Sequence, residues 1–169
     1  QIMLSKILSK ETCKNCKFCC SFKRQSLWET PLFSAKQKDF LQNKYPFSKF
    51  KLVKDDVFTI DLDNSYKTHD QNEEAKCYFL DTNNGCILSK DEKPFDCSIW
   101  PFRLMKKQDK LVIALTPTCP AINKIPLEEI CEFVNFAVRF YSLSRHRMIR
   151  EGAVYSPIIK EIALTILNV

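Results

Sequence analysis

Four of the nine cysteines of this chain stand within eight residues, in the run CKNCKFCC from Cys13 to Cys20. Two-residue gaps let successive sulfur atoms turn toward a common centre, as in zinc ribbons and bacterial ferredoxins. The adjacent Cys19 and Cys20 point in divergent directions in either helix or strand, so they do not easily ligate one tetrahedral ion. The run therefore predicts a fold organised around cysteine-bound metal, with Cys19 and Cys20 serving two centres or one bridged centre.

Two further cysteines lie at the ends of a predicted hairpin. Residues 75–80 predict a strand that contains Cys77, and residues 81–85 predict the turn that brings Cys86 back beside it. Cys97 follows Pro94, which suits the first turn of a short helix, and Pro101 must end that helix. The hairpin is therefore predicted to present Cys77 and Cys86 together.

The last cysteine, Cys131, has a different context. It lies on the apolar stripe of a predicted helix, and the stripe consists of Leu127, Ile130, Cys131, Val134, Val138 and Tyr141. Free cysteine is among the residue types most often buried. We therefore interpret Cys131 as a core residue and not as a ligand.

The remaining cysteine pattern resembles that of the CxxCxxCC zinc- or iron-chelating domain family over about residues 13–120. The matching segments are the opening run, Cys77-Tyr78-Phe79-Leu80, Cys86, the segment from Lys93 to Pro101, and Cys119. The chain departs from the family where Lys93 and Ser98 replace arginines and where Trp100 replaces phenylalanine. The resemblance implies that eight cysteines are metal ligands: Cys13, Cys16, Cys19, Cys20, Cys77, Cys86, Cys97 and Cys119.

Zinc and iron–sulfur clusters both accept four thiolates. The C-x2-C-x2-C triplet and the Cys119-Pro120 pair, which resembles the remote ligand of two-cluster ferredoxins, favour iron–sulfur of the 4Fe–4S type, with zinc as the alternative. Our hypothesis divides the ligands between two centres. One centre would use Cys13, Cys16, Cys19 and Cys119, and the other would use Cys20, Cys77, Cys86 and Cys97.

The rest of the chain predicts a small α+β domain with hairpins around the metal centres and helices at its C-terminal end. We expect a cysteine-rich region over residues 1–125 and a helical extension over 126–169 that packs on the same domain. The predicted elements are a helix from Ser34 to Tyr45 with Phe40, Leu41 and Tyr45 on its buried side, strands at 50–53 and 57–62, a hairpin over 105–115, and helices at 126–144 and 156–167.

Composition excludes several classes of protein. With only Gly85 and Gly152, the chain has no glycine-rich dinucleotide turn and no Walker loop, and two histidines do not make an H-E-x-x-H protease. No apolar run is long enough to cross a bilayer, so we expect no membrane partner. An odd cysteine count in a chain of 169 residues favours a reducing cytoplasm over a secreted disulfide framework.

Two functions are compatible with these features. The first is a metal-binding protein whose centres are structural or transfer electrons, with a redox partner. The second is an enzyme or enzyme subunit related to protein-lysine N-methylation or cluster-dependent modification, with a protein substrate as partner, because the cysteine domain also resembles part of flagellin-lysine N-methylases. We expect no nucleic-acid partner, since the basic cluster from Arg145 to Arg150 lacks interleaved aromatic residues and suits a solvated helix end.

Overall fold

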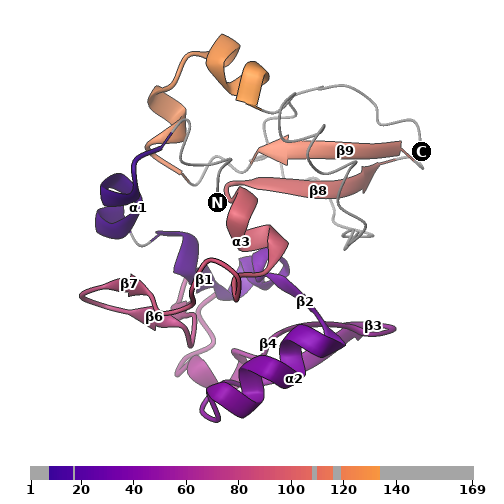
Figure 1. Cartoon of the computed structure of the whole chain (residues 1–169). Coiled ribbons are helices and arrows are strands. Elements are labelled where there is room, and N and C mark those ends of the chain that lie inside the picture. Colours follow the sequence, from indigo (N-terminus) through magenta and orange to yellow (C-terminus); the bar gives the residue numbers. More distant parts are fainter. Residues whose placement is uncertain (1–7, 17, 108–109, 116–118, 134–169) are drawn as a thin grey trace. The chain divides into compact units, whose positions relative to one another are not determined.

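The computed structural model describes residues 8–16, 18–107, 110–115 and 119–133. Over these ranges the chain combines short helices with small antiparallel sheets, which confirms the predicted α+β class (Figure 1). It divides into two compact units, Lys14–Cys97 and the combination of Gln1–Cys13 with Ser98–Val169. None of the helices within the described ranges could span a membrane.

The largest sheet of the Lys14–Cys97 unit has three strands in the order β2–β4–β3. Their bounds are Leu32–Ser34 for β2, Phe50–Lys54 for β3 and Val57–Ile60 for β4. This confirms the predicted strands at 50–53 and 57–62, although β4 ends earlier than expected. It ends because the Asp61 carboxylate accepts the Asp63 N–H at 3.1 Å and starts a 3-10 turn, η4 (Asp63–Ser65).

Helix α2 (Ala35–Lys44) follows β2 and packs along β2 and β4 (Figure 1). Ser34 caps it as predicted: the Ser34 Oγ accepts the Gln37 N–H at 3.2 Å, and the Gln37 side chain accepts the Ser34 N–H. Leu41 is buried and Tyr45 is half-buried, but Phe40 is 52% exposed, so its predicted burial is wrong. Successive helical residues lie about 100° apart, and α2 turns only the Leu41 side inward. We call α2 and the β2–β4–β3 sheet the sheet layer.

Two smaller ladders complete this unit. Strand β1 (Ser21–Lys23) pairs with β5 (Glu74–Lys76), and β6 (Leu80–Asp81) pairs with β7 (Gly85–Cys86). The predicted strand over 75–80 is wrong in its middle, because residues 77–79 form a turn in which the Leu80 N–H donates to the Cys77 carbonyl at 3.1 Å. Short 3-10 helices η2 (Phe18–Cys20) and η3 (Arg24–Glu29) flank β1.

One apolar core joins the ladders to the sheet layer. Its side chains interlock through aromatic contacts such as Phe33–Phe50, whose ring centroids are 5.1 Å apart, and Tyr45–Phe79 at 5.6 Å. The buried members are Phe22, Phe33, Leu41, Ile60, Leu62, Tyr66, Ala75, Phe79 and Leu88. Cys77 and Cys86 pack against this core from its edge.

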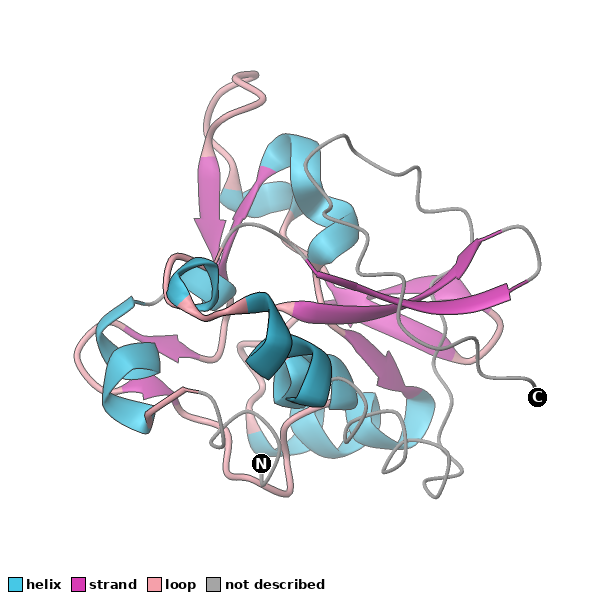
Figure 2. Cartoon of the chain, turned by 90° about the horizontal axis from the view of Figure 1, so that it is seen from above, coloured by secondary structure: helices cyan, strands magenta, loops and turns pink. Residues whose placement is uncertain are grey.

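In the other unit, strands β8 (Phe102–Lys107) and β9 (Lys110–Leu115) form the predicted hairpin, which begins three residues earlier than expected. Figure 2 shows its two paired strands in magenta. The Phe102 and Phe133 rings pack with centroids 5.0 Å apart, and Ile122 in η5 (Ile122–Lys124) is fully buried. Residues 127–133 are helical, whereas the rest of the predicted helix 126–144 and the whole of 156–167 lie outside the described residues.

Candidate metal centre

Cys20 and Cys77 are brought together by the β1–β5 ladder. Ser21 pairs with Lys76, so Cys20 and Cys77 are the next opposed positions, and the Cys77 N–H donates to the Cys20 carbonyl at 2.8 Å. In a hydrogen-bonded antiparallel pair the two Cα atoms lie about 5.5 Å apart and the two side chains leave the same face. The ladder therefore aligns two thiols that are far apart in sequence.

Cys86 reaches the same place through the turn that the sequence predicts. The Asp81 carboxylate accepts the Asn83 and Asn84 N–H groups, and Gly85 adopts a φ of +85°, a conformation that glycine allows. Cys86 then pairs with Leu80, and the following Ile87 N–H donates to the Phe79 carbonyl at 2.8 Å. The β6–β7 hairpin that follows Cys77 therefore brings the Cys86 thiol back to the vicinity of Cys77.

The pKa values of two of these thiols reflect their buried surroundings and one another. Burial, and to a smaller extent a negative charge on Cys86, raise the pKa of the Cys20 thiol to about 12, against the opposing effect of the Lys93 ammonium. Burial also raises the pKa of Cys77, as do charges on Cys20 and Cys86, while the Phe79 N–H opposes them. We call Cys20, Cys77 and Cys86 the cysteine corner.

Cys97 belongs to the same compact unit and lies on helix α3 (Phe95–Ile99). The Cys97 N–H donates to the carbonyl of Pro94, a buried residue, at 3.0 Å. Beside Cys97, the buried Asp96 carboxylate accepts the Leu32 N–H at 3.0 Å, which ties α3 to β2. Sequence patterns did not single out Asp96, because its partner lies far away in the chain and gives no local signal.

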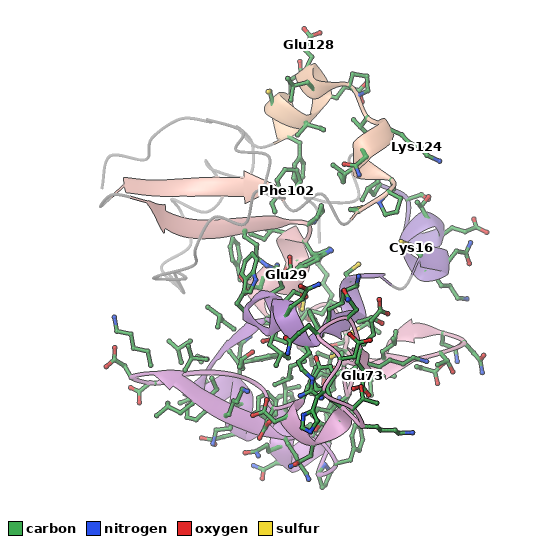
Figure 3. All side chains as sticks on the ribbon, turned by 180° about the vertical axis from the view of Figure 1, so that it is seen from behind. Cys16, Glu29, Glu73, Phe102, Lys124 and Glu128 are labelled. Atoms are coloured by element: carbon green, nitrogen blue, oxygen red, sulfur yellow. The ribbon has the colours of Figure 1, made fainter. Side chains whose placement is uncertain are left out.

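The other predicted set is spread over both units. Helix α1 (Lys10–Cys16) carries Cys13 and Cys16 one turn apart. Cys16 is labelled in Figure 3, and the half-buried Cys19 lies in η2. Cys13 and Cys119 belong to one unit, whereas Cys16 and Cys19 belong to the other. Cys119 is buried, and its carbonyl accepts the Asn123 N–H at 3.2 Å. The division of the eight ligands into two centres remains a hypothesis.

Cys131 lies on the helix formed by residues 127–133. Its neighbour Ile130 is buried, Cys131 is half-buried, and Leu127 is 65% exposed, so the predicted burial of Leu127 on the apolar stripe is wrong. A helix that buries Ile130 and Phe133 turns Leu127 toward water. No disulfide involves Cys131, and the same is true of Cys16, Cys20, Cys77, Cys86 and Cys119.

The three thiols of the cysteine corner are neighbours but not a formed ligand set. Within the ranges that the structure describes, no three histidine, cysteine, aspartate or glutamate side chains are arranged so that they could hold a metal ion. The residue types suit a thiophilic metal, since thiolates are the ligands that zinc and iron–sulfur clusters prefer. Comparison with protein-family models, with curated proteins and with solved structures found no match.

Proposed function

We propose that this chain is a cysteine-ligated metal-binding protein, with an iron–sulfur cluster in preference to zinc. One centre would be held by the cysteine corner together with Cys97, and its role would be structural or electron transfer. The observation that carries the proposal is the alignment of Cys20 with Cys77 at the end of the β1–β5 ladder, with Cys86 in their electrostatic neighbourhood. When bound, the metal would supply the counter-charge that thiolates need in an apolar setting.

The surroundings of the corner support this proposal. Cys77 and Cys86 pack against the apolar core. Burial there raises the pKa of the Cys77 thiol, because an uncompensated thiolate is costly in an apolar setting. Metal binding requires the thiolate form, so a bound ion would convert these thiols into thiolate ligands.

The second centre is proposed from Cys13, Cys16, Cys19 and Cys119. Its support is the C-x2-C-x2-C spacing and the Cys119-Pro120 pair, which is also what favours iron–sulfur over zinc. Because adjacent cysteines diverge, Cys19 would serve this centre and Cys20 the other.

Metal content of the purified chain tests the proposal. The protein is purified anaerobically, and iron, acid-labile sulfide and zinc are measured in the wild type and in Cys20→Ser, Cys77→Ser, Cys119→Ser and Cys131→Ser. We expect Cys20→Ser and Cys77→Ser to lose the same share of the metal, Cys119→Ser to lose the other share, and Cys131→Ser to match the wild type. A wild-type chain that contains no metal after anaerobic reconstitution would contradict the proposal.

A further inference from the structure

The β1–β5 ladder holds Cys20 and Cys77 in a fixed register. Phe22 and Ala75 are opposed in this ladder, and both side chains are at most 3% exposed in the apolar core. A slip of one residue would turn one strand's side chains to the other face, so the burial of Phe22 and Ala75 fixes the pairing. Cys20 and Cys77 lie two positions beyond this pair, and the period of a strand therefore places them on its core-facing side.

Backbone hydrogen bonds show which kind of pair the two cysteines form. The Cys77 N–H donates to the Cys20 carbonyl at 2.8 Å, and at the other end of the ladder the Arg24 N–H donates to the Glu73 carbonyl at 3.0 Å. Both bonds join directly opposed residues, which is the hydrogen-bonded type of antiparallel pair, with Cα atoms about 5.5 Å apart. Disulfides commonly join Cα atoms about 4.4–6.8 Å apart, so this backbone can accept a Cys20–Cys77 bond.

The same geometry indicates how stable that bond would be. Opposed Cβ atoms lie up to about 5.5 Å apart in a hydrogen-bonded pair, whereas a relaxed disulfide has them about 3.8 Å apart. A disulfide at this position is therefore strained, and strained disulfides are the readily reduced ones. Both cysteines are free thiols and only half-buried, so a small reagent can reach them. These features suit a reversible bond and not a permanent cross-link.

We propose that Cys20 and Cys77 form a reversible disulfide, with a small disulfide such as glutathione disulfide as the oxidant. One protein thiolate attacks a sulfur atom of glutathione disulfide and releases one glutathione. The other protein thiolate then attacks the protein sulfur of the mixed disulfide and releases the second glutathione. The protein loses two electrons and two thiol protons, and the two released glutathione thiols receive them.

This inference does not rest on the proposed function. The disulfide and the metal centre exclude each other, because the same two sulfur atoms are proposed as ligands. The test therefore uses the full chain after treatment with chelator, so that its outcome is independent of bound metal.

Peptide mapping detects the bond. The background variant Cys19→Ser/Cys86→Ser leaves one cysteine in each of the tryptic peptides 18–23 and 77–90. The protein is incubated with increasing glutathione disulfide at a fixed glutathione concentration until the linked fraction no longer changes. The remaining thiols are then blocked, and mass spectrometry measures the fraction of the two peptides that is joined.

Three controls separate the ladder geometry from the mere presence of two thiols. Lys76→Cys/Cys77→Ser in the same background moves one thiol to the opposite face of β5, at an exposed position where the fold tolerates a cysteine. Cys19→Ser/Cys77→Ser leaves Cys20 with Cys86 as the alternative partner. The background variant in urea shows how readily the two thiols join without the ladder.

We expect the folded background variant to be half-linked at a glutathione disulfide concentration at least about 10-fold lower than in urea, because the ladder has already closed the long loop between the two cysteines. Excess glutathione should reverse the link. The Lys76→Cys/Cys77→Ser variant should need as much oxidant as the unfolded chain. Equal linking by that variant and the background variant, no gain over urea, or easier linking of Cys20 to Cys86 would overturn the inference. A wild type without metal would instead overturn the proposed function alone.

Discussion

The sheet layer and the cysteine corner belong to the same unit but are held together differently. In the sheet layer Phe33, Leu41 and Ile60 are at most 1% exposed, and the capping box at Ser34 satisfies the first turn of α2. The cysteine corner depends on strands of two or three residues, and it places thiols where the sheet layer places apolar side chains. Apolar packing is therefore sufficient for the sheet layer, whereas under the proposed function a bound metal would be the main stabilising partner of the corner.

Metal removal should produce the largest difference in amide protection between the cysteine corner and the sheet layer. Amide hydrogen exchange is compared between zinc-loaded and chelator-treated protein at the Cys77, Leu80 and Ile87 N–H groups, which make the backbone hydrogen bonds of the corner. With free zinc at about 100 times the dissociation constant, local openings that release the ion should become about 100-fold rarer. We expect chelation to reverse this protection at the corner.

The Tyr45 N–H, which donates to the Leu41 carbonyl at 2.7 Å in the sheet layer, is the internal control for that comparison. It should keep most of its protection after chelation. Equal loss at Tyr45 and Leu80 would show that the two regions open as one cooperative unit, and the contrast between them would then be wrong.

Phe33→Ala tests whether apolar packing stabilises the sheet layer. Phe33 is 1% exposed and packs edge-on against Phe50, so its truncation should lower the free energy of unfolding by about 3–5 kcal/mol. Urea unfolding of chelator-treated protein measures this loss of free energy. Leu52→Ala in the same sheet is the control, because Leu52 is 60% exposed and should change the value by no more than about 0.5 kcal/mol. A Phe33→Ala loss as small as that of Leu52→Ala would contradict apolar control of this layer.

A smaller effect is expected at the start of α2. Ser34→Ala removes the side chain that accepts the Gln37 N–H, and it should cost about 1 kcal/mol in urea unfolding. Ser34→Gly should cost only a few tenths of a kcal/mol, because glycine is tolerated at this position. If the alanine and glycine variants were equally destabilised, the capping hydrogen bond would not be the cause.

The sequence predicted those features whose signals are local. Ser34 lies next to the helix that it caps, Asp81 to Gly85 lie within their own turn, and the β8–β9 hairpin closes over neighbouring residues. Their free energy comes from contacts a few residues apart, which is the range over which periodicity and turn chemistry carry information.

The part of the candidate site that sequence could not predict is the β1–β5 ladder. Its strands have three residues each, too few for an alternating pattern, and they pair across more than half of the unit. The alignment of Cys20 with Cys77 follows from that pairing. Phe40 shows the opposite error, because an aromatic residue beside Leu41 suggested burial but α2 turns it to solvent.

The smallest expected effect concerns the end of the β1–β5 ladder away from the corner, at Glu73 (Figure 3). The Lys67 N–H, the Thr68 hydroxyl and N–H, and the Arg24 guanidinium together lower the pKa of Glu73 to about 2. Because the folded pKa of Glu73 lies below the ordinary value of 4.5, the ionised carboxylate stabilises the fold fully above pH 4.5, and this stabilisation is lost as the pH falls toward 2.

In chelator-treated protein, the urea midpoint of Glu73→Gln should therefore lie below that of the wild type at pH 6, and the difference between the two midpoints should narrow between pH 4.5 and 2.5. Glu74→Gln, at the exposed neighbouring position, should follow the wild-type curve. A gap between wild type and Glu73→Gln that stays constant with pH would mean that Glu73 supports the ladder through its shape and not through its charge.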